Sequence, residues 1–468
     1  MTKRFKPYQP EQLLLLPPNL QDWVAEDHLV RFISDVVDSL DLDDILRRYR
    51  EPTGQPPHHP AMMVKVLLYA YCIGMPSSRR IERATWEDVP MRLLSAQAHP
   101  DHSTIAEFRK RHLPALARLF VQVLAICKTA GLVKLGHVAL DGTKIKANAS
   151  KHKAMGYERM TDTEQGLVGE VEALLAEAKT VDAAENARYG PGKRGDEIPK
   201  DLARRESRLA KIREAKAALE DFAREKAARK AVEQQAKLDA WEQKAEETGK
   251  KPGGQPPQVA NPAEAVPDPK AQRNFTDPES RIMKDGASKS FEQAYNAQAV
   301  VDDTAQIIVA TGVTQEANDK RQLVPMLEKL IATGFRPDKV SADAGYFSSE
   351  AITDERMAGI DLYVPPDRQK HGQPLPTPAD CRPEGFPADS DASVIETMRH
   401  RLRTETGKAV YKMRKAIVEP VFGQIKEGRG FRRFSFRGLL PVTQEWDLIC
   451  LTHNLLKLFR SGANWRTA

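Results

Sequence analysis

Two aspartates stand where a metal-dependent site could form. Asp141 and Asp343 each follow a short apolar run, residues 137–140 and 339–342, and a glycine turn follows each of them. The strands of an α/β sheet build their sites at the carboxyl edge of the sheet. If these two strands are parallel neighbours, both carboxylates can share a metal ion, and hard oxygen ligands suit Mg²⁺ or Mn²⁺. Asp before Gly is also common turn chemistry, so the two acids alone leave the site undecided.

Glu419 is the best candidate for the further carboxylate that a two-metal site requires. At about 100° per residue, one line along a helix, within roughly 40°, holds four charged residues: Lys412, Lys415, Glu419 and Lys426. Such a stripe places lysines, which can bind a phosphate, beside a carboxylate, which can bind the metal ion. A metal-bound phosphodiester would need both. A solvated helix face with i,i+4 ion pairs is the commoner meaning of the same pattern. Pro420 either bends this helix or begins a new one.

Positive charge is concentrated around Glu419. Residues 399–437 contain twelve lysines and arginines and three acids, a net charge of +9 in a chain whose net charge is +6. Because basic groups hold phosphates, this segment favours a polyanionic substrate. The phenylalanines between the basic residues are more often core residues than platforms for bases. The residues predicted to bind nucleic acid are therefore all basic: Lys412, Lys415, Lys426, Arg432 and Arg433.

The elements that would position these residues are of two kinds. Residues 20–130 have apolar side chains at helical spacing, which predicts a compact helical domain whose basic edges either bind nucleic acid or are solvated. Near residue 135 the spacing of the apolar residues changes from helical to strand-like. From there the predicted elements are, in order, a strand, a helical insertion, a hairpin, a helix, a strand, a helix and a strand. The predicted β-hairpin joins residues 291–301 to residues 306–313. This order predicts a mixed α/β sheet that is interrupted early.

The helical insertion is predicted from residues 164–187 and 199–246, which are rich in Ala, Glu, Lys and Arg. One apolar stripe of an amphipathic helix runs along the second segment: Leu209, Ile212, Ala215, Leu219 and Phe222. A Gly/Pro break at residues 190–195 indicates an antiparallel pair of helices, and residues 249–270 are a Pro/Gly-rich linker. The mixed charge of the pair is typical of a solvated surface, to which we assign no chemistry.

Composition excludes several other classes of protein. The four cysteines lie far apart and form no CxxC pair, which argues against a disulfide framework and a structural zinc site. The start has no apolar run long enough for a signal peptide, and the longest apolar stretch, residues 62–73, is too short to span a bilayer. We therefore expect a cytoplasmic protein that does not contact a membrane.

Five blocks of the sequence resemble the DDE transposases of bacterial insertion sequences, in the branch with a Tyr-Arg-Glu-Lys signature around the third acid. The blocks are residues 140–144 (Leu-Asp-Gly-Thr-Lys), 276–283 (Thr-Asp-Pro-Glu-Ser-Arg-Ile-Met), 295–298 (Tyr-Asn-Ala-Gln), 342–346 (Ala-Asp-Ala-Gly-Tyr) and 418–426 (Val-Glu-Pro-Val-Phe-Gly-Gln-Ile-Lys). The resemblance implies an RNase H-like mixed-sheet catalytic core. It also implies that Asp141, Asp343 and Glu419 are the catalytic residues and hold two Mg²⁺ (or Mn²⁺) ions.

The domain organisation that follows combines this resemblance with the predicted elements. Residues 1–130 form an all-α N-terminal domain that binds DNA ends, and residues 131–160 with 274–460 form the catalytic core. Residues 161–248 form the helical hairpin insertion after the first strand, and residues 249–273 form the linker. By resemblance the partner is DNA, at transposon ends and target sites, and a homodimer is expected when two ends are brought together on the bacterial nucleoid.

The signature departs from the family spacing in one place. Its Lys falls on Lys426, but the family places Arg four residues before the Glu, where this chain has Lys415. Arg414 stands one residue too early, as does Tyr411. On helical geometry, Lys415 is the residue favoured for the role of the Arg, although lysine holds a phosphate only as a point charge.

Three alternatives to a transposase that cuts DNA and joins it to a target remain open. An RNase H-like nuclease without strand transfer would share the acids and the metals. A domesticated, non-catalytic DNA-binding protein would retain the acids without activity. A helical scaffold protein explains residues 160–246 and no other part of the chain.

Overall fold

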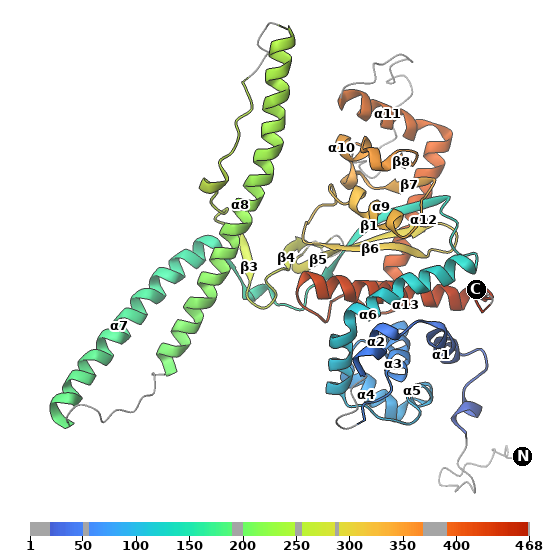
Figure 1. The fold of residues 1–468 in the computed structure, drawn as a ribbon, viewed down its shortest axis with the longest axis horizontal. Helices are drawn as coiled ribbons and strands as arrows, with labels where there is room; N and C mark the ends of the chain where they lie inside the picture. Colours follow the sequence, from blue (N-terminus) through green and yellow to red (C-terminus); the bar gives the residue numbers. More distant parts are fainter. Residues whose placement is uncertain are drawn as a thin grey trace, which may run out of the picture. The chain divides into compact units, whose positions relative to one another are not determined.

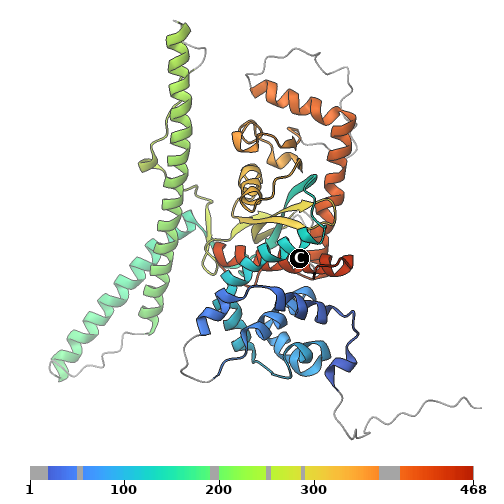
Figure 2. The ribbon, with the colours of Figure 1, turned by 45° about the vertical axis from the view of Figure 1, so that its right-hand side comes forward.

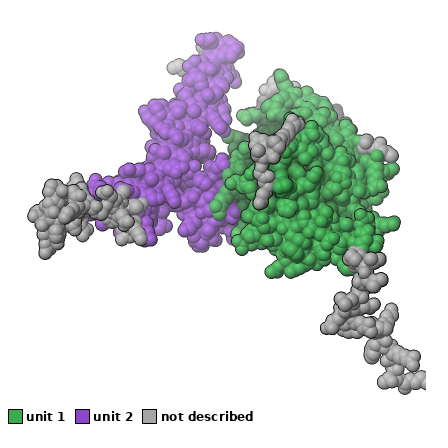
Figure 3. All heavy atoms as spheres, turned by 60° about the horizontal axis from the view of Figure 1, so that its bottom comes forward, with its two compact units in different colours: residues 1–145, 296–468 green, residues 146–295 purple. Residues whose placement is uncertain are grey.

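The computed structural model describes residues 19–49, 56–189, 200–248, 255–285, 290–367 and 391–466. The chain divides into two compact units, one of residues 1–145 with 296–468 and one of residues 146–295 (Figure 3). Two predicted features, the Gly/Pro break at residues 190–195 and residues 249–254 of the linker, lie outside the described residues.

The first unit begins with helices, as the apolar spacing predicts. They are α1 (Leu29–Ser39), α2 (Asp43–Leu46), α3 (Pro60–Cys72), α4 (Ser78–Glu87), α5 (Val89–Leu94) and α6 (His102–Thr129). Helix α3 is apolar on nearly all sides, and all of its residues except Ala61, Met62 and Lys65 are buried. Both α3 and α6 pack against the last helix of the chain, α13 (Leu439–Ser461).

A mixed sheet follows, so the predicted α/β fold is confirmed. Its order is β4-β5-β1-β7-β8, with β6 paired to β5. The strands are β1 (His137–Lys146), β4 (Arg281–Lys284), β5 (Phe291–Asp302), β6 (Ile308–Thr314), β7 (Lys339–Ala342) and β8 (Asp361–Tyr363). The hairpin of β5 and β6 is antiparallel, as predicted, whereas β1, β7 and β8 are parallel. The pairing of β4 involves only residues 291–294 of β5, which belong to the second unit.

Helices cover both faces of this sheet. Both α9 (Leu323–Ala332) and α13 pack against β6, and Figures 1 and 2 show them on opposite sides of the sheet. Two side chains of α13 are fixed to strand backbone: Trp446 Nε1 donates to Gln298 O at 2.9 Å, and the amide of Asn454 bonds both N and O of Ile308 at 2.8 Å. These buried hydrogen bonds fix the position of α13 on the sheet.

Glu419 lies on a helix that continues through its proline. After α10 (Ser349–Ile352) and α11 (Asp391–Arg403), α12 runs from Glu405 to Gly423 and includes Pro420. A π-helix, η8 (Gln424–Gly428), extends it by one turn. No new helix begins at Pro420, so the alternative in which Pro420 starts a helix is wrong.

The second unit contains α7 (Tyr157–Tyr189) and α8 (Lys200–Thr248), with β2 (Ala154–Gly156) paired to β3 (Gln272–Asn274). A small core joins the two helices, and it includes four residues of the predicted stripe: Leu209, Ile212, Ala215 and Leu219. Phe222, the fifth, is exposed. Glu170 pairs with Arg205, and Glu164 pairs with Arg213, so the two helices run antiparallel along this contact.

Among the described helices, none has both the length and the apolar character needed to cross a bilayer.

Candidate active site

Asp141 and Asp343 lie next to each other on neighbouring strands. The pairing of β1 with β7 is parallel and runs from His137↔Lys339 to Leu140↔Ala342, so an aspartate directly follows the last paired residue of each strand. The expected parallel neighbours are therefore confirmed. One detail differs: β1 does not end at Asp141 but continues to Lys146, whereas β7 does end before Asp343. Asp343 instead begins a short 3₁₀ turn, accepting from Gly345 N at 2.8 Å.

The environment of Asp141 disfavours its negative charge. Burial raises the pKa of Asp141 to about 6; Arg414 opposes this increase, and the nearby charge of Asp343 adds to it. The carboxylate accepts from Gly142 N at 2.8 Å and from Arg414 Nη1 at 3.0 Å. Two carboxylates this close repel each other, and a bound cation would relieve that repulsion.

Arg414 connects Asp141 to Glu419. Its side chain is buried, with 8% exposed, and its Nη2 lies 3.8 Å from Glu419 Oε1 while Nη1 bonds Asp141. Its guanidinium also lies 5.9 Å from the centre of the Tyr411 ring. Glu419 itself is more open, with 55% of its side chain exposed. In the structure, Arg414 is therefore the residue that lies beside the acids. Helical geometry favoured Lys415 for this role, but Lys415 is exposed.

Two lysines lie at the same edge of the sheet. Lys426 Nζ donates to Thr143 Oγ1 and to Lys144 O, both at 3.2 Å. Lys144 is largely buried, and burial lowers its pKa, while the charges of Asp319, Asp141 and Asp343 raise it. Of the predicted basic residues, Lys426 is therefore the one that the structure brings to β1.

The other predicted basic residues lie on exposed surface. Lys412 and Lys415 are exposed on α12, and Arg432 and Arg433 are exposed beyond η8. Arg432 pairs with Glu427. Within the described part of the chain, neither Arg432 nor Arg433 forms an ion pair with the three candidate acids. The phenylalanines beside them, Phe431 and Phe434, are buried, as the sequence favoured.

A polar layer behind Asp141 was missed by the sequence reasoning. Asp319 Oδ1 accepts from Asn296 Nδ2 at 2.6 Å and from Gln298 Nε2 at 2.7 Å, and Lys144 Nζ lies 4.0 Å away. Tyr346 donates its hydroxyl proton to Gln298. One signal was available: Asn296 and Gln298 alternate on the predicted strand, so both amides face the same side of the sheet. In the structure both are fully buried and hydrogen-bonded.

The donors at this edge fit a divalent metal in part. Asp141 and Asp343 supply the hard oxygen atoms that Mg²⁺ and Mn²⁺ prefer. Among the described residues, no group of three or more Asp, Glu, His or Cys is already arranged as a set of ligands. Glu419 is linked to the pair through Arg414, so the third carboxylate is near the site without completing such a set.

Two family models match parts of the chain. Residues 18–111 match the family described as "Transposase domain (DUF772)", and residues 265–455 match the family described as "Transposase DDE domain". The second match includes Asp343 and Glu419, whereas Asp141 lies between the two matches. No curated protein and no solved structure matches the chain.

Proposed function

Because the chain belongs to the DDE transposases of bacterial insertion sequences, we propose that it cuts DNA at the ends of its own element and joins those ends to target DNA. The observation that supports this most is the placement of Asp141 and Asp343, side by side where the pairing of two parallel strands ends. Arg414 adds Glu419 to the same group. These three acids are the proposed catalytic residues, on a core that we propose to be RNase H-like.

The proposed reaction has two transfers at phosphorus. Water first hydrolyses a phosphodiester at the transposon end and leaves a 3′-OH; that 3′-OH then attacks a phosphodiester of the target, and the new bond forms as the old one breaks. Two divalent ions held by Asp141, Asp343 and Glu419 would activate the attacking oxygen and stabilise the leaving one. Arg414 would hold Asp141 and Glu419 in place, and Lys426 would fix the strand β1 that contains Asp141.

The remaining parts have supporting roles in this proposal. The exposed Lys412, Lys415, Arg432 and Arg433 would bind the DNA backbone as point charges or forks. The helical domain of residues 1–130 would recognise transposon ends, and its match to a transposase domain supports that role. Two copies would act together on two ends, on nucleoid DNA in the bacterial cytoplasm.

The test is cleavage and strand transfer with Mg²⁺ or Mn²⁺ on DNA that carries the element's own ends. We expect Asp141→Ala, Asp343→Ala and Glu419→Ala each to lower the rate on the order of 10³-fold or more, a barrier increase of about 4 kcal/mol, while DNA binding persists. Glu405→Ala is the matched control, because Glu405 is a fully solvated acid on the same helix.

Other outcomes would contradict parts of the proposal. Cleavage without joined products would indicate a nuclease. Binding without cleavage by the wild type would indicate a domesticated protein. Full activity of Glu419→Ala alone would mean that Glu419 has only a structural role.

A further inference from the structure

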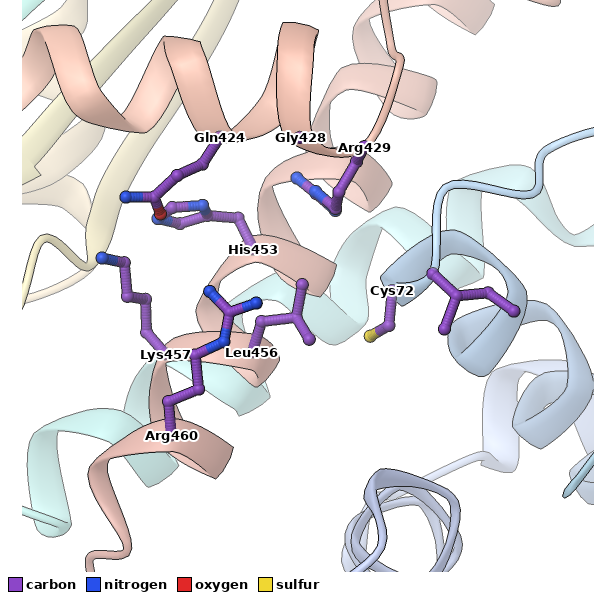
Figure 4. Close-up of a pocket in the computed structure, with 9 residues that line it drawn as sticks. Cys72, Gln424, Gly428, Arg429, His453, Leu456, Lys457 and Arg460 are labelled. Carbon is purple, nitrogen blue, oxygen red and sulfur yellow. The ribbon is translucent and has the colours of Figure 1, made fainter.

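A small cavity outside the candidate active site is lined by positive charge. Its volume is about 230 Å³, and it lies between η8, α13 and the end of α3, all in the first unit (Figure 4). Three cations line it: Arg429, just after η8, and Lys457 and Arg460 on α13. Figure 4 shows side chains from these separate segments gathered around one space.

No lining side chain supplies a compensating negative charge. Burial raises the pKa of the Cys72 thiol to about 12, so this group is neutral. His453 donates from Nε2 to Gln306 O at 3.0 Å, and burial together with the three cations lowers its pKa to about 3, so it is neutral too. In the described residues, Arg429, Lys457 and Arg460 form no ion pair with a carboxylate. The cavity therefore has an excess of positive charge.

Arg429 is the unusual member of this group. Its side chain is about nine-tenths buried, and it donates to two neutral oxygens, Thr452 Oγ1 at 2.8 Å and Ile449 O at 3.1 Å. Its Nε is buried without a hydrogen-bond partner. Burial lowers the pKa of Arg429 to about 10, which still leaves it charged at neutral pH. A buried charge without an opposite charge is costly, and the structure maintains it here.

The backbone is also adapted to hold Arg429. Gly74, two residues beyond α3, has a φ of +73°, and a Cβ at this position would lie 2.3 Å from Arg429 O. A glycine therefore allows the backbone that follows α3 to approach Arg429 closely.

We propose that this cavity binds a phosphate group through Arg429, Lys457 and Arg460. A guanidinium fork and an ammonium group are the donors that bind phosphate best. The volume is below the roughly 300 Å³ at which pockets begin to hold drug-sized ligands, so it suits one phosphate group and not a whole nucleotide. The phosphate could belong to the DNA backbone, which rests on the proposed function, or to a free phosphate ion.

The DNA source is consistent with the path of the chain. Arg429 follows Glu419 by ten residues of α12 and η8, so at 1.5 Å per residue the two lie roughly 15 Å apart along the helix. That distance is short compared with the DNA that a transposase must hold, so one duplex could reach both places.

The first measurement is binding of inorganic phosphate to the full chain by calorimetry, at constant ionic strength with chloride as the replacement. We expect Lys457→Gln and Arg460→Gln each to weaken phosphate binding by about tenfold, as expected for a lost charged hydrogen bond. Arg224→Gln, an exposed cation paired with Asp221, is the charge-matched control and should bind as the wild type does. No phosphate binding by the wild type, or equal binding by all variants, would overturn the proposal.

The second measurement separates the two sources. Duplex DNA binding is measured at several salt concentrations, and each lost phosphate contact should reduce the slope of log K against log salt by about 0.9. A reduced slope in Arg460→Gln but not in Arg224→Gln identifies the DNA backbone as the source. An unchanged slope with weakened binding of inorganic phosphate identifies the free ion. Neither result depends on cleavage, so a failure of the proposed catalytic function is seen separately.

Discussion

At the residue scale, Gly142 shows how closely the polar layer approaches the candidate active site. A Cβ at this position would lie 2.4 Å from Gln298 Nε2, 2.8 Å from Asp319 Oδ1 and 2.9 Å from Asn296 Oδ1. Gln298 Nε2 donates to Asp319 Oδ1 at 2.7 Å, and Asn296 is held to the same oxygen through its Nδ2 at 2.6 Å, so the three side chains of this network have little room to move. A side chain at residue 142 would therefore displace either the network or the strand that contains Asp141.

We predict that Gly142→Ala lowers the free energy of unfolding by about 1–3 kcal/mol, as overpacking does. Because Asp141 is the adjacent residue, DNA cleavage should fall as well. Denaturant unfolding and the cleavage assay measure the two effects. Gly136→Ala is the control, since a Cβ there meets nothing within 4 Å. Equal stability of the two variants would show that the side chains of Asn296, Gln298 and Asp319 move aside at little cost in free energy.

Arg414 is predicted to stabilise the site as well as position its acids. Arg414→Gln removes the partner of Asp141 and leaves a carboxylate with little solvent around it, so unfolding should become easier by about 3 kcal/mol, at the low end for a broken buried pair. Cleavage should be lost. Lys415→Gln is the neighbouring control: because Lys415 is exposed, the substitution should leave unfolding unchanged and reduce cleavage only through the proposed contact with DNA. Thermal unfolding and DNA cleavage are measured for both variants. A larger loss of cleavage in Lys415→Gln than in Arg414→Gln would support the prediction that Lys415 has the role of the signature Arg.

Asp447 gives a prediction about pH. Burial raises its pKa to about 6, while Thr311, which donates to it, opposes the increase. A carboxyl whose pKa is higher in the folded state than in the unfolded state stabilises the fold at low pH, and that stability is lost as pH rises from about 4 to 6. Asp447→Asn keeps an oxygen for Thr311 and removes the charge. It should stabilise the protein at pH 7 by on the order of 1–3 kcal/mol.

The measurement for Asp447 is unfolding by denaturant between pH 4 and pH 8. The gain of Asp447→Asn over the wild type should grow from pH 4 to pH 6 and then stay constant. Asp22→Asn, at an exposed acid, should show no such growth. A constant difference at every pH would mean that the charge of Asp447 is not the cause.

The sequence suggested the pair of aspartates because each follows a short apolar run and precedes a glycine turn, and the resemblance to the transposase family supported the same pair. It could not predict the place of Arg414. Helical geometry ranks residues by their angle from Glu419, but which side of α12 is buried depends on its packing against β7 and β8. That packing buries Arg414 and leaves Lys412 and Lys415 in solvent. The polar layer gave only a weak signal, the alternation of Asn296 and Gln298, because its third partner, Lys144, comes from a strand far from Asp319 in the sequence.

At the element scale, α12 shows how a proline is accommodated inside a helix. Proline has no N–H, so Pro420 leaves the carbonyl of Ala416 without its usual partner. The side chain of Gln306 donates to Ala416 O at 2.9 Å and replaces the missing bond. Gln306 comes from the β5–β6 turn and has a φ of +58°. The sequence left the two meanings of Pro420 open because the replacement donor lies more than a hundred residues away.

The helical pair of the second unit allows a prediction about local stability. Ile212 is 1% exposed in the core shared by α7 and α8, and truncating such a side chain costs about 2–5 kcal/mol. Ile212→Ala should therefore increase hydrogen exchange along both helices. Val232→Ala, at an exposed position of α8, should leave exchange unchanged. Equal exchange in the two variants would show that the small core does not hold the helices together.

At the scale of the whole molecule, the sequence predicted the helices and strands better than it predicted which strands are neighbours in the sheet. The helical beginning, the β5–β6 hairpin and the mixed sheet follow from local periodicity. Sheet order does not, because neighbouring strands such as β1 and β7 are brought together over long separations. The unit of residues 146–295 also includes β2, β3 and β4, which are too short to give a clear periodic signal.

The pairing of β1 with β7 has a consequence for protein synthesis. Asp141 and Asp343 are 202 positions apart, and Glu419 comes later still. A chain grows from its N-terminus, so Asp141 leaves the ribosome long before its neighbouring strand exists. Closing so long a segment is also slow compared with local folding. A truncated product that ends before residue 343 would retain the N-terminal helices without the paired aspartates. Under the proposed function, the ability to cut DNA is therefore acquired only after Glu419 has been synthesised.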